Sequence, residues 1–296
     1  MSTVTRRALG KFLREIREGA GKSLLSAGLA VETSKHTVAR LEDGIPTRMI
    51  TAQIEGLLDL YGVTSTVRSE ALELWSEVRE QAKVSKLQGG SKGFWQAYAD
   101  QFASHFPHYL RLEAAADRVT THQLVLVHGL LQTSDYRRTL ARIDYPDLSN
   151  VDVERRVELT ERRQDRLSTS GFRFDAFLSE AALRHPVGGP MVMAEQLRWL
   201  AQLGTRPNVG IRVVPFGPSH RGLTIGSFTL LEFPRLTSGL REPPVVYLEG
   251  ALGALYHEQT DIIAQYREAI DALRAVALTE DNTRGLVLTV AKEYAA

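Results

Sequence analysis

Apolar residues recur at helical spacing through the N-terminal third of the chain, separated by polar residues and short breaks. The pattern predicts five helices, over residues 9–19, 24–30, 35–42, 50–61 and 67–82. Ser23 and Ser34 stand directly before the second and third helices, where their hydroxyl groups can cap the first turn. Gly44 and Pro46 end the third helix.

The remaining two thirds of the chain alternate between two kinds of pattern. Helices are predicted over 94–117, 133–143, 150–168, 190–203 and 261–276. Strands are predicted over 172–178, 209–215, 227–233 and 245–249. Their order predicts an α+β domain with a small sheet, beside an all-α N-terminal bundle. The polar segment 84–93 is predicted to be a linker between domains 1–83 and 94–296.

Two segments of the larger domain receive a structural interpretation. The alternating charges of Glu154–Arg166 indicate a solvated helix face with ion pairs four residues apart. The segment Gly129–Thr133 indicates a buried turn that leads into a helix capped by Thr133, in preference to a loop that binds a ligand.

Composition alone does not point to nucleic acid, because the formal net charge is only +1. The charge is uneven, however: residues 1–48 carry nine lysines and arginines against five acidic residues. This basic end can supply contacts to phosphates.

The chain has no cysteine, which excludes disulfides, cysteine-based zinc sites and thiol catalysis. It shows neither the apolar core of a signal peptide nor an apolar run long enough to span a membrane. We therefore expect a cytoplasmic protein without membrane attachment.

Helices 24–30 and 35–42 have the lengths and the short connection of a helix-turn-helix, whose second helix enters the major groove of DNA. The apolar seam between them is predicted to consist of Ala27, Val31, Val38 and Leu41.

Polar residues gather where such a motif reads base edges. Ser34, Lys35, His36 and Thr37 begin the second helix of the motif, and Arg40 lies one turn further on. Basic side chains suit guanine edges or phosphates, and threonine can contact a thymine methyl group. These five residues are the predicted DNA-reading surface.

Three flanking residues are predicted to contact the DNA backbone. Ser23, with the first amides of helix 24–30, is placed to hold one phosphate. Thr47 and Arg48, in the loop after the reading helix, are placed to hold the next.

The segments Leu9–Arg17, Ser34–Gly44 and Leu57–Gly62 together resemble the xenobiotic-response-element (XRE) family, relatives of the phage Cro and C1-type repressors. The resemblance implies that Ser34–Arg40 is the recognition helix. It also implies a scaffold ion pair between the positions of Arg40 and Glu42, so Arg40 is either a DNA contact or a structural residue.

Three residues depart from that family's usual pattern. Leu24 stands where a glutamine usually braces a DNA contact, Gly28 where an alanine is usual, and Glu32 where a glycine is usual. Gly28 is expected to cost about 1 kcal/mol of helix stability relative to alanine, and Glu32 places a negative charge near DNA. The isolated module is therefore expected to bind weakly.

Motifs of the larger domain resemble the domain that follows XRE modules in actinobacterial regulators of the WhiJ type. They are Val127–Tyr136, Glu161–Leu167, Glu180–Leu183, Pro186–Gly189, Gln196–Leu197, Arg206–Val209, Val214–Phe216 and Val246–Glu249, with His128 where a proline is usual. The resemblance implies an antitoxin-like domain that binds a small partner protein encoded nearby.

No catalytic or metal-binding pattern stands out. The eight histidines are scattered. His105 and His108 lie three residues apart with Glu113 beyond them, but no third ligand follows at a spacing typical of metal sites. No Gly-x-Ser-x-Gly elbow occurs. We expect no enzyme, no cofactor and no metal.

The sequence thus predicts a transcriptional regulator, a repressor that binds double-stranded DNA as a homodimer, because one small module holds DNA weakly. Two alternatives remain open. One is an antitoxin-like interaction protein, and the other is a sensor with a small-molecule pocket in the C-terminal domain.

Overall fold

The computed structural model describes residues 4–87, 106–217, 222–235, 242–250 and 253–295. The chain divides into two compact units. One comprises residues 1–92 together with 233–243, and the other comprises residues 93–232 together with 244–296.

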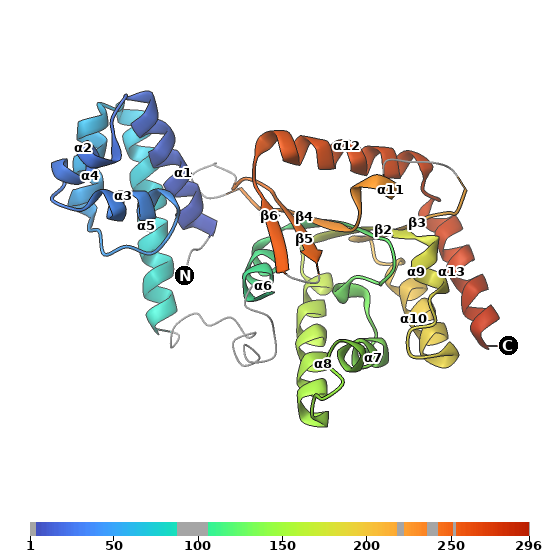
Figure 1. The fold of residues 1–296 in the computed structure, drawn as a ribbon. Helices are drawn as coiled ribbons and strands as arrows, with labels where there is room; N and C mark the ends of the chain where they lie inside the picture. Colours follow the sequence, from blue (N-terminus) through green and yellow to red (C-terminus); the bar gives the residue numbers. More distant parts are fainter. Residues whose placement is uncertain (1–3, 88–105, 218–221, 236–241, 251–252, 296) are drawn as a thin grey trace. The chain divides into compact units, whose positions relative to one another are not determined.

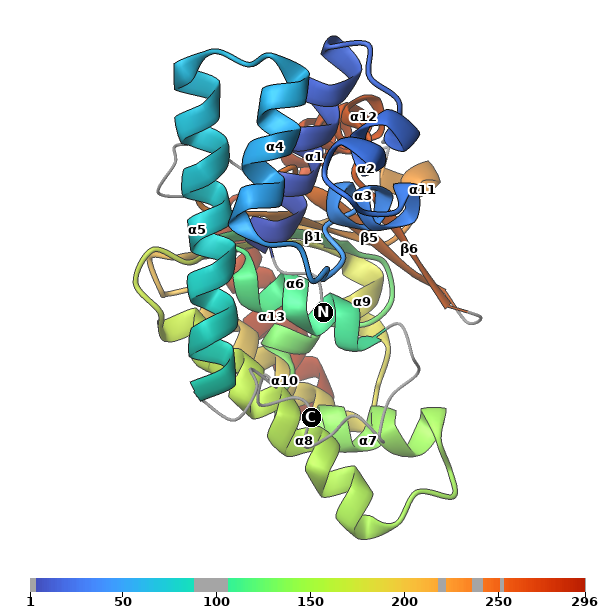
Figure 2. The same cartoon turned by 90° about the vertical axis from the view of Figure 1, so that its left-hand side faces the viewer.

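The N-terminal unit contains five helices, as predicted (Figures 1 and 2). They are α1 (Val4–Gly19), α2 (Leu24–Ala30), α3 (Lys35–Glu42), α4 (Thr51–Tyr61) and α5 (Ser65–Leu87). Their apolar stripes meet in one core that includes Leu9, Leu13, Ile54 and Leu57. Because α5 continues to Leu87, residues 84–87 are helical and do not belong to a linker; residues 88–93 lie outside the described residues.

The C-terminal unit is built on a six-stranded mixed sheet, which confirms the predicted α+β class. Its strands are β1 (Arg118–Gln123), β2 (Arg173–Ser179), β3 (Val209–Val214), β4 (Phe228–Glu232), β5 (Val245–Gly250) and β6 (Gly253–His257), in the order β3-β2-β1-β4-β5-β6. The pairs β1–β2 and β2–β3 are parallel, and the remaining pairs are antiparallel.

Helices cover both faces of this sheet (Figure 1). They are α6 (Phe106–Ala115), α7 (Ser134–Asp144), α8 (Asn150–Gln164), α9 (Glu180–Arg184), α10 (Pro190–Leu203), α11 (Gly222–Ile225), α12 (Thr260–Val276) and α13 (Glu280–Ala295), with short 3-10 turns η2 (Gly129–Leu131) and η3 (Asp165–Ser168). Helix α12 packs on one face through Ile263, Ile270 and Leu273. Helices α7, α8, α10 and α13 lie on the other side.

Five helices and strands of the C-terminal unit were not predicted from the sequence: β1, β6, α9, α11 and α13. Strand β1 is central in the sheet, yet it carries Thr120, Thr121 and His122, all buried. A search for apolar residues therefore misses this strand. Its polar side chains can be buried because they form hydrogen bonds within the protein; the Thr121 hydroxyl, for example, donates to the Phe228 carbonyl at 2.9 Å. Of the helix predicted over 94–117, residues 94–105 lie outside the described residues, and α6 forms the part from Phe106 onward.

Candidate nucleic-acid interface

Helices α2 and α3 pack as a helix-turn-helix. The seam predicted from the sequence is confirmed, since Ala27, Val31, Val38 and Leu41 are all buried. Leu24, at the start of α2, packs on the edge of the same core. A small apolar core therefore fixes α3 against α2, and the polar side of α3 remains outside it.

Gly28 has a packing role that the sequence did not reveal. A Cβ atom at this position would lie 2.8 Å from the Thr33 carbonyl oxygen and 3.0 Å from the Lys35 backbone nitrogen. The start of α3 thus crosses α2 at a distance that only glycine permits. Alanine at this position is therefore not expected to stabilise α2, in contrast to the expectation from helix propensity, because its Cβ atom would clash with the backbone of Thr33 and Lys35.

The turn between the two helices passes through Glu32, which adopts a left-handed backbone conformation with φ of 51°. Among the described residues it is the only non-glycine with a positive φ. L-residues with a Cβ atom are disfavoured there, which explains why glycine suits this position. The Thr33 amide donates to the Gly28 carbonyl at 2.8 Å and closes the turn.

Serine caps begin both helices of the motif, as predicted. The Ser34 hydroxyl accepts a hydrogen bond from the Thr37 amide at 3.1 Å, and its oxygen lies 3.0 Å from the Thr37 hydroxyl. Ser23 accepts from the Ser26 amide at 3.0 Å. The Ser34–Thr37 contact fixes the first turn of α3, so the side chains between them project from a rigid backbone.

The structure places all eight predicted DNA contacts in this unit. Thr37 and Thr47 are half-buried. The other six are exposed, namely Ser23, Ser34, Lys35, His36, Arg40 and Arg48. Lys35 and His36 lie in the first turn of α3, where a recognition helix approaches base edges.

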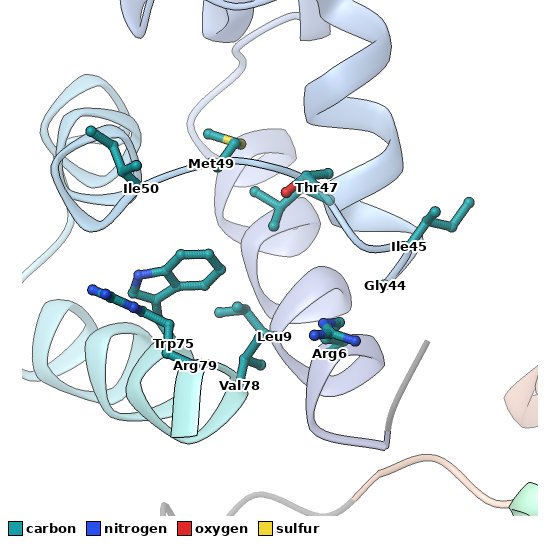
Figure 3. A pocket seen from close by; sticks show the side chains of 11 residues that line it. Arg6, Leu9, Gly44, Ile45, Thr47, Met49, Ile50, Trp75, Val78 and Arg79 are labelled. Atoms are coloured by element: carbon teal, nitrogen blue, oxygen red, sulfur yellow. The ribbon is translucent and has the colours of Figure 1, made fainter. Parts of the chain in front are cut away.

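The loop after α3 carries Thr47 and Arg48 and runs past a cleft of about 210 Å³ (Figure 3). Leu9 and Trp75 form its apolar wall, and Arg6 and Arg79 also line it. The Trp75 indole nitrogen donates to the Thr51 hydroxyl at 3.0 Å, and the Arg79 guanidinium donates to the same oxygen at 2.7 Å.

A buried ion pair fixes the far end of α3. The Arg17 guanidinium donates from Nε and Nη2 to the two carboxylate oxygens of Glu42, at 2.6 and 2.9 Å. The hydrogen bonds that Arg17 donates to the Glu42 carboxylate raise the pKa of Arg17. Arg14 also reaches Glu42, at 3.4 Å. The scaffold pair implied for Arg40 is therefore formed by Arg17 instead. The side chain of Arg40 forms no ion pair with a described residue, and its one hydrogen bond there goes to the Pro46 carbonyl, at 3.4 Å.

The C-terminal unit buries a second polar cluster. The Arg163 guanidinium donates to both carboxylate oxygens of Glu113, at 2.7 and 2.8 Å. The Tyr109 hydroxyl donates to Glu113 at 2.8 Å and lies 3.0 Å from Nε2 of His128. Because His128 Nδ1 accepts from the Leu130 amide at 3.2 Å, Nε2 carries the proton and donates to Tyr109.

The protonation states of this cluster follow from burial and from its charges. Burial lowers the pKa of His128 to about 4, so the imidazole is neutral. Burial alone would raise the pKa of Glu113, but the Arg163 guanidinium holds it below its ordinary value. Glu113 is therefore an anion paired with a buried cation.

The expectation that Glu154–Arg166 is a solvated face is wrong in part. Arg162 and Glu158 do form an exposed pair four residues apart, at 2.6 Å, but Arg156 and Arg163 are buried. Both buried arginines share a helical stripe with Val153, which is also buried. Their seven-residue spacing along that stripe was the signal that could have revealed them.

The predicted turn at Gly129–Thr133 is present. Leu130 and Leu131 are buried, and the Thr133 hydroxyl caps α7 by accepting from the Tyr136 amide at 3.4 Å. Of the histidines considered as metal ligands, His105 lies outside the described residues. The ring of His108 lies against that of Tyr256. Within the described ranges, no group of three or more side chains is arranged to hold a metal ion.

Helices long and apolar enough to cross a bilayer are likewise absent from the part of the chain that the structure describes. Comparison with family models gives two matches. Residues 8–71 match a helix-turn-helix domain, and residues 106–289 match a domain of unknown function, DUF5753. No curated protein and no solved structure matches the chain. The second match spans more than half of the chain, so the protein belongs to the DUF5753 family and carries a DNA-binding helix-turn-helix domain at its N-terminus.

Proposed function

We propose that this protein is a sequence-specific transcriptional repressor that binds a two-fold symmetric DNA site as a homodimer. The observation that carries the proposal is the first turn of α3, where Lys35 and His36 are exposed between the mutually bonded Ser34 and Thr37. A rigid, exposed and polar helix start is what base reading in the major groove requires.

The electrostatics of the module also favour DNA. Arg40 and Arg48 are exposed on and just after α3, and the Glu42 carboxylate, which would repel phosphates, is buried against Arg17. Dimerisation follows from size, since one short recognition helix reads only a half-site and two-fold pairing restores affinity. Nothing in this role requires catalysis, and we propose a non-enzymatic regulator.

Gel-shift titration of the full chain on promoter DNA from its own locus tests the proposal. Replacing Lys35 and His36 together with alanine is expected to remove the preference for the specific site and to leave the helical circular dichroism signal unchanged. Arg68→Ala is the matched control, because Arg68 is a cation of the same unit that lies on α5 and pairs with Asp59.

Salt dependence separates base contacts from phosphate contacts. Arg48→Ala is expected to weaken binding to all DNA and to lower the slope of log K against log salt by about one. If specific and random DNA bind equally at every salt concentration, the proposed function is wrong. Analytical ultracentrifugation of the complex checks the two-to-one stoichiometry.

A small partner protein encoded nearby is a second proposal for the C-terminal domain. Large apolar side chains are exposed around the connection of α7 and α8, namely Ile143, Tyr145 and Val151, at 63%, 44% and 70%. Clustered apolar exposure is typical of protein-binding surfaces. Co-expression with the neighbouring short reading frame, followed by size-exclusion chromatography, tests it. Co-elution that is lost on Val151→Asp supports the partner, and separate elution contradicts it.

A further inference from the structure

The C-terminal domain contains a cavity of about 850 Å³. Its walls come from the loop after β1, from residues of α6, α7 and α8, and from the ends of β4 and β5. Small-molecule sites typically enclose roughly 300–1,000 Å³. All of its lining residues belong to the C-terminal unit.

Three arginines line this one cavity: Arg137 from α7, and Arg156 and Arg163 from α8. Arg163 is neutralised by the buried Glu113 described above. The guanidinium of Arg156 lies over the Tyr145 ring, 4.3 Å from its centre. Two acidic residues, Asp144 and Glu249, also line the cavity, both at exposed positions.

Arg137 differs from the other two arginines. Its guanidinium forms no hydrogen bond and no ion pair with any residue that the structure describes. Burial, followed by repulsion from Arg163 and Arg156, lowers its pKa to about 10, in spite of the attraction of Asp144 and Glu249. Arg137 is therefore a partly desolvated cation without a hydrogen-bonded counterion, and an anion in the cavity would stabilise it.

A second group in the wall also lacks a partner. The side-chain nitrogen of Gln132 donates to the Val127 carbonyl at 2.7 Å, which fixes the orientation of the amide. The Gln132 amide oxygen is buried, and within the described residues it accepts no hydrogen bond. A buried acceptor without a donor costs free energy, so a ligand with an N–H or O–H group would satisfy it.

We propose that this cavity binds a small anionic molecule, a carboxylate or phosphate that also carries hydroxyl or amino groups, with Arg137 holding the anion and Gln132 accepting from a donor. Arginine forms paired charge-assisted hydrogen bonds with both kinds of anion. The sequence had favoured a structural turn over a ligand-binding loop for the segment 129–133. Gly129 and Gln132 of this segment, and His128 just before it, line the cavity, so the proposal gives the turn a binding role as well.

The test uses three probes of similar size: glucose 6-phosphate, gluconate and glucose. Isothermal titration calorimetry of the full chain at constant ionic strength is expected to show millimolar or tighter binding of at least one of the two anions and none of glucose. Whichever anion binds more tightly identifies the headgroup. The measurement contains no DNA, so it is independent of the proposed regulatory function.

Arg137→Met is expected to weaken anion binding tenfold or more, because it removes the cation. Arg137→Lys retains the charge without the paired donors, so its anion affinity is expected to lie between those of the wild type and Arg137→Met. Arg198→Met is the matched control, because Arg198 is exposed on α10 and does not line the cavity; its anion affinity should equal that of the wild type.

A second readout separates a binding residue from a structural one. Without ligand, Arg137→Met is expected to raise Tm, because it removes a desolvated cation beside two others, whereas Arg198→Met should leave Tm unchanged. The proposal is overturned if neither anion binds at millimolar concentration, if glucose binds equally well, or if Arg137→Met and Arg198→Met weaken anion binding equally. A fall in Tm for Arg137→Met with unchanged anion binding overturns it as well.

Discussion

Each of the two domains contains a buried arginine–glutamate pair that joins two of its helices, and these two pairs have different surroundings. Arg17 and Glu42 join α1 to the end of α3, and Arg17 has further partners in the Glu18 carboxylate and the Lys22 carbonyl. Arg163 and Glu113 join α8 to α6 beside a cavity, and the hydrogen bonds of Arg163 to described residues all go to Glu113.

The two pairs therefore have different roles. In the N-terminal domain the pair closes a packed interface and holds the recognition helix in place. In the C-terminal domain the pair belongs to a chain of polar groups, His128–Tyr109–Glu113–Arg163, which adjoins a space large enough for a ligand. Four sets of substitutions test the packed helices of the N-terminal domain and the polar cluster of the C-terminal domain, in order of decreasing expected effect.

The largest effect is expected from Glu113→Gln, which leaves Arg163 buried with its charge uncompensated. Such a change typically costs about 3–5 kcal/mol of unfolding free energy. Glu42→Gln is expected to cost about 1.5–3 kcal/mol, because Arg17 retains Glu18 and the Lys22 carbonyl. Urea denaturation of the full chain measures both.

The double variant Glu113→Gln with Arg163→Met is the control for the first prediction. It removes both charges and should recover most of the lost stability. Equal losses for Glu113→Gln and Glu42→Gln, or a larger loss at Glu42, would contradict the contrast between the two pairs.

The second effect is a pH dependence that arises at His128. Its pKa is about 4 in the folded protein against 6.5 ordinarily, so the unfolded chain binds a proton that the folded chain excludes. Stability is full above pH 6.5 and falls as the pH drops towards 4, by up to about 3 kcal/mol. Denaturation midpoints across this range measure it.

His128→Asn supplies the control for this pH dependence. Its side-chain oxygen can still accept from the Leu130 amide, but the side chain does not titrate. The slope of stability between pH 6.5 and 4.5 should flatten; an unchanged slope would assign the effect to other groups.

The third effect concerns the close crossing of α2 and α3. Gly28→Ala is expected to cost about 1–3 kcal/mol, because the new Cβ atom would lie 2.8 Å from a backbone oxygen. Gly19→Ala is the matched control, since nothing lies within 4 Å of a Cβ atom there. In thermal denaturation, the Tm of Gly28→Ala should lie below that of the wild type, and the Tm of Gly19→Ala should equal or exceed it. A stabilised Gly28→Ala would show that the crossing relaxes.

The smallest effect lies in the turn. Glu32→Gly is expected to stabilise the protein by about 1 kcal/mol, because glycine adopts a positive φ without steric cost. Glu32→Gln removes the charge but retains the Cβ atom, so its stability should match the wild type. If both variants gain equally, the charge of Glu32 is the cause, and backbone strain is not.

Much of the N-terminal domain could be predicted from the sequence. The seam Ala27, Val31, Val38 and Leu41 and the caps Ser23 and Ser34 were all located correctly, because they depend on contacts between residues close in the chain. The DNA contacts themselves remain predictions from this local pattern. The partner of Glu42 was missed, since Arg17 lies 25 residues away and on another helix.

In the C-terminal domain the sequence determined the class and most helices and strands, through apolar periodicity. The central position of polar β1 in the sheet and the burial of Arg156 and Arg163 became visible only in the folded protein. Folding also brought Glu113, His128 and Arg163 together from three separate elements. The physical reason is that periodicity records which side of an element avoids water, whereas a buried charge is tolerated only where folding supplies its partner, and that partner is set by topology and not by spacing along the chain.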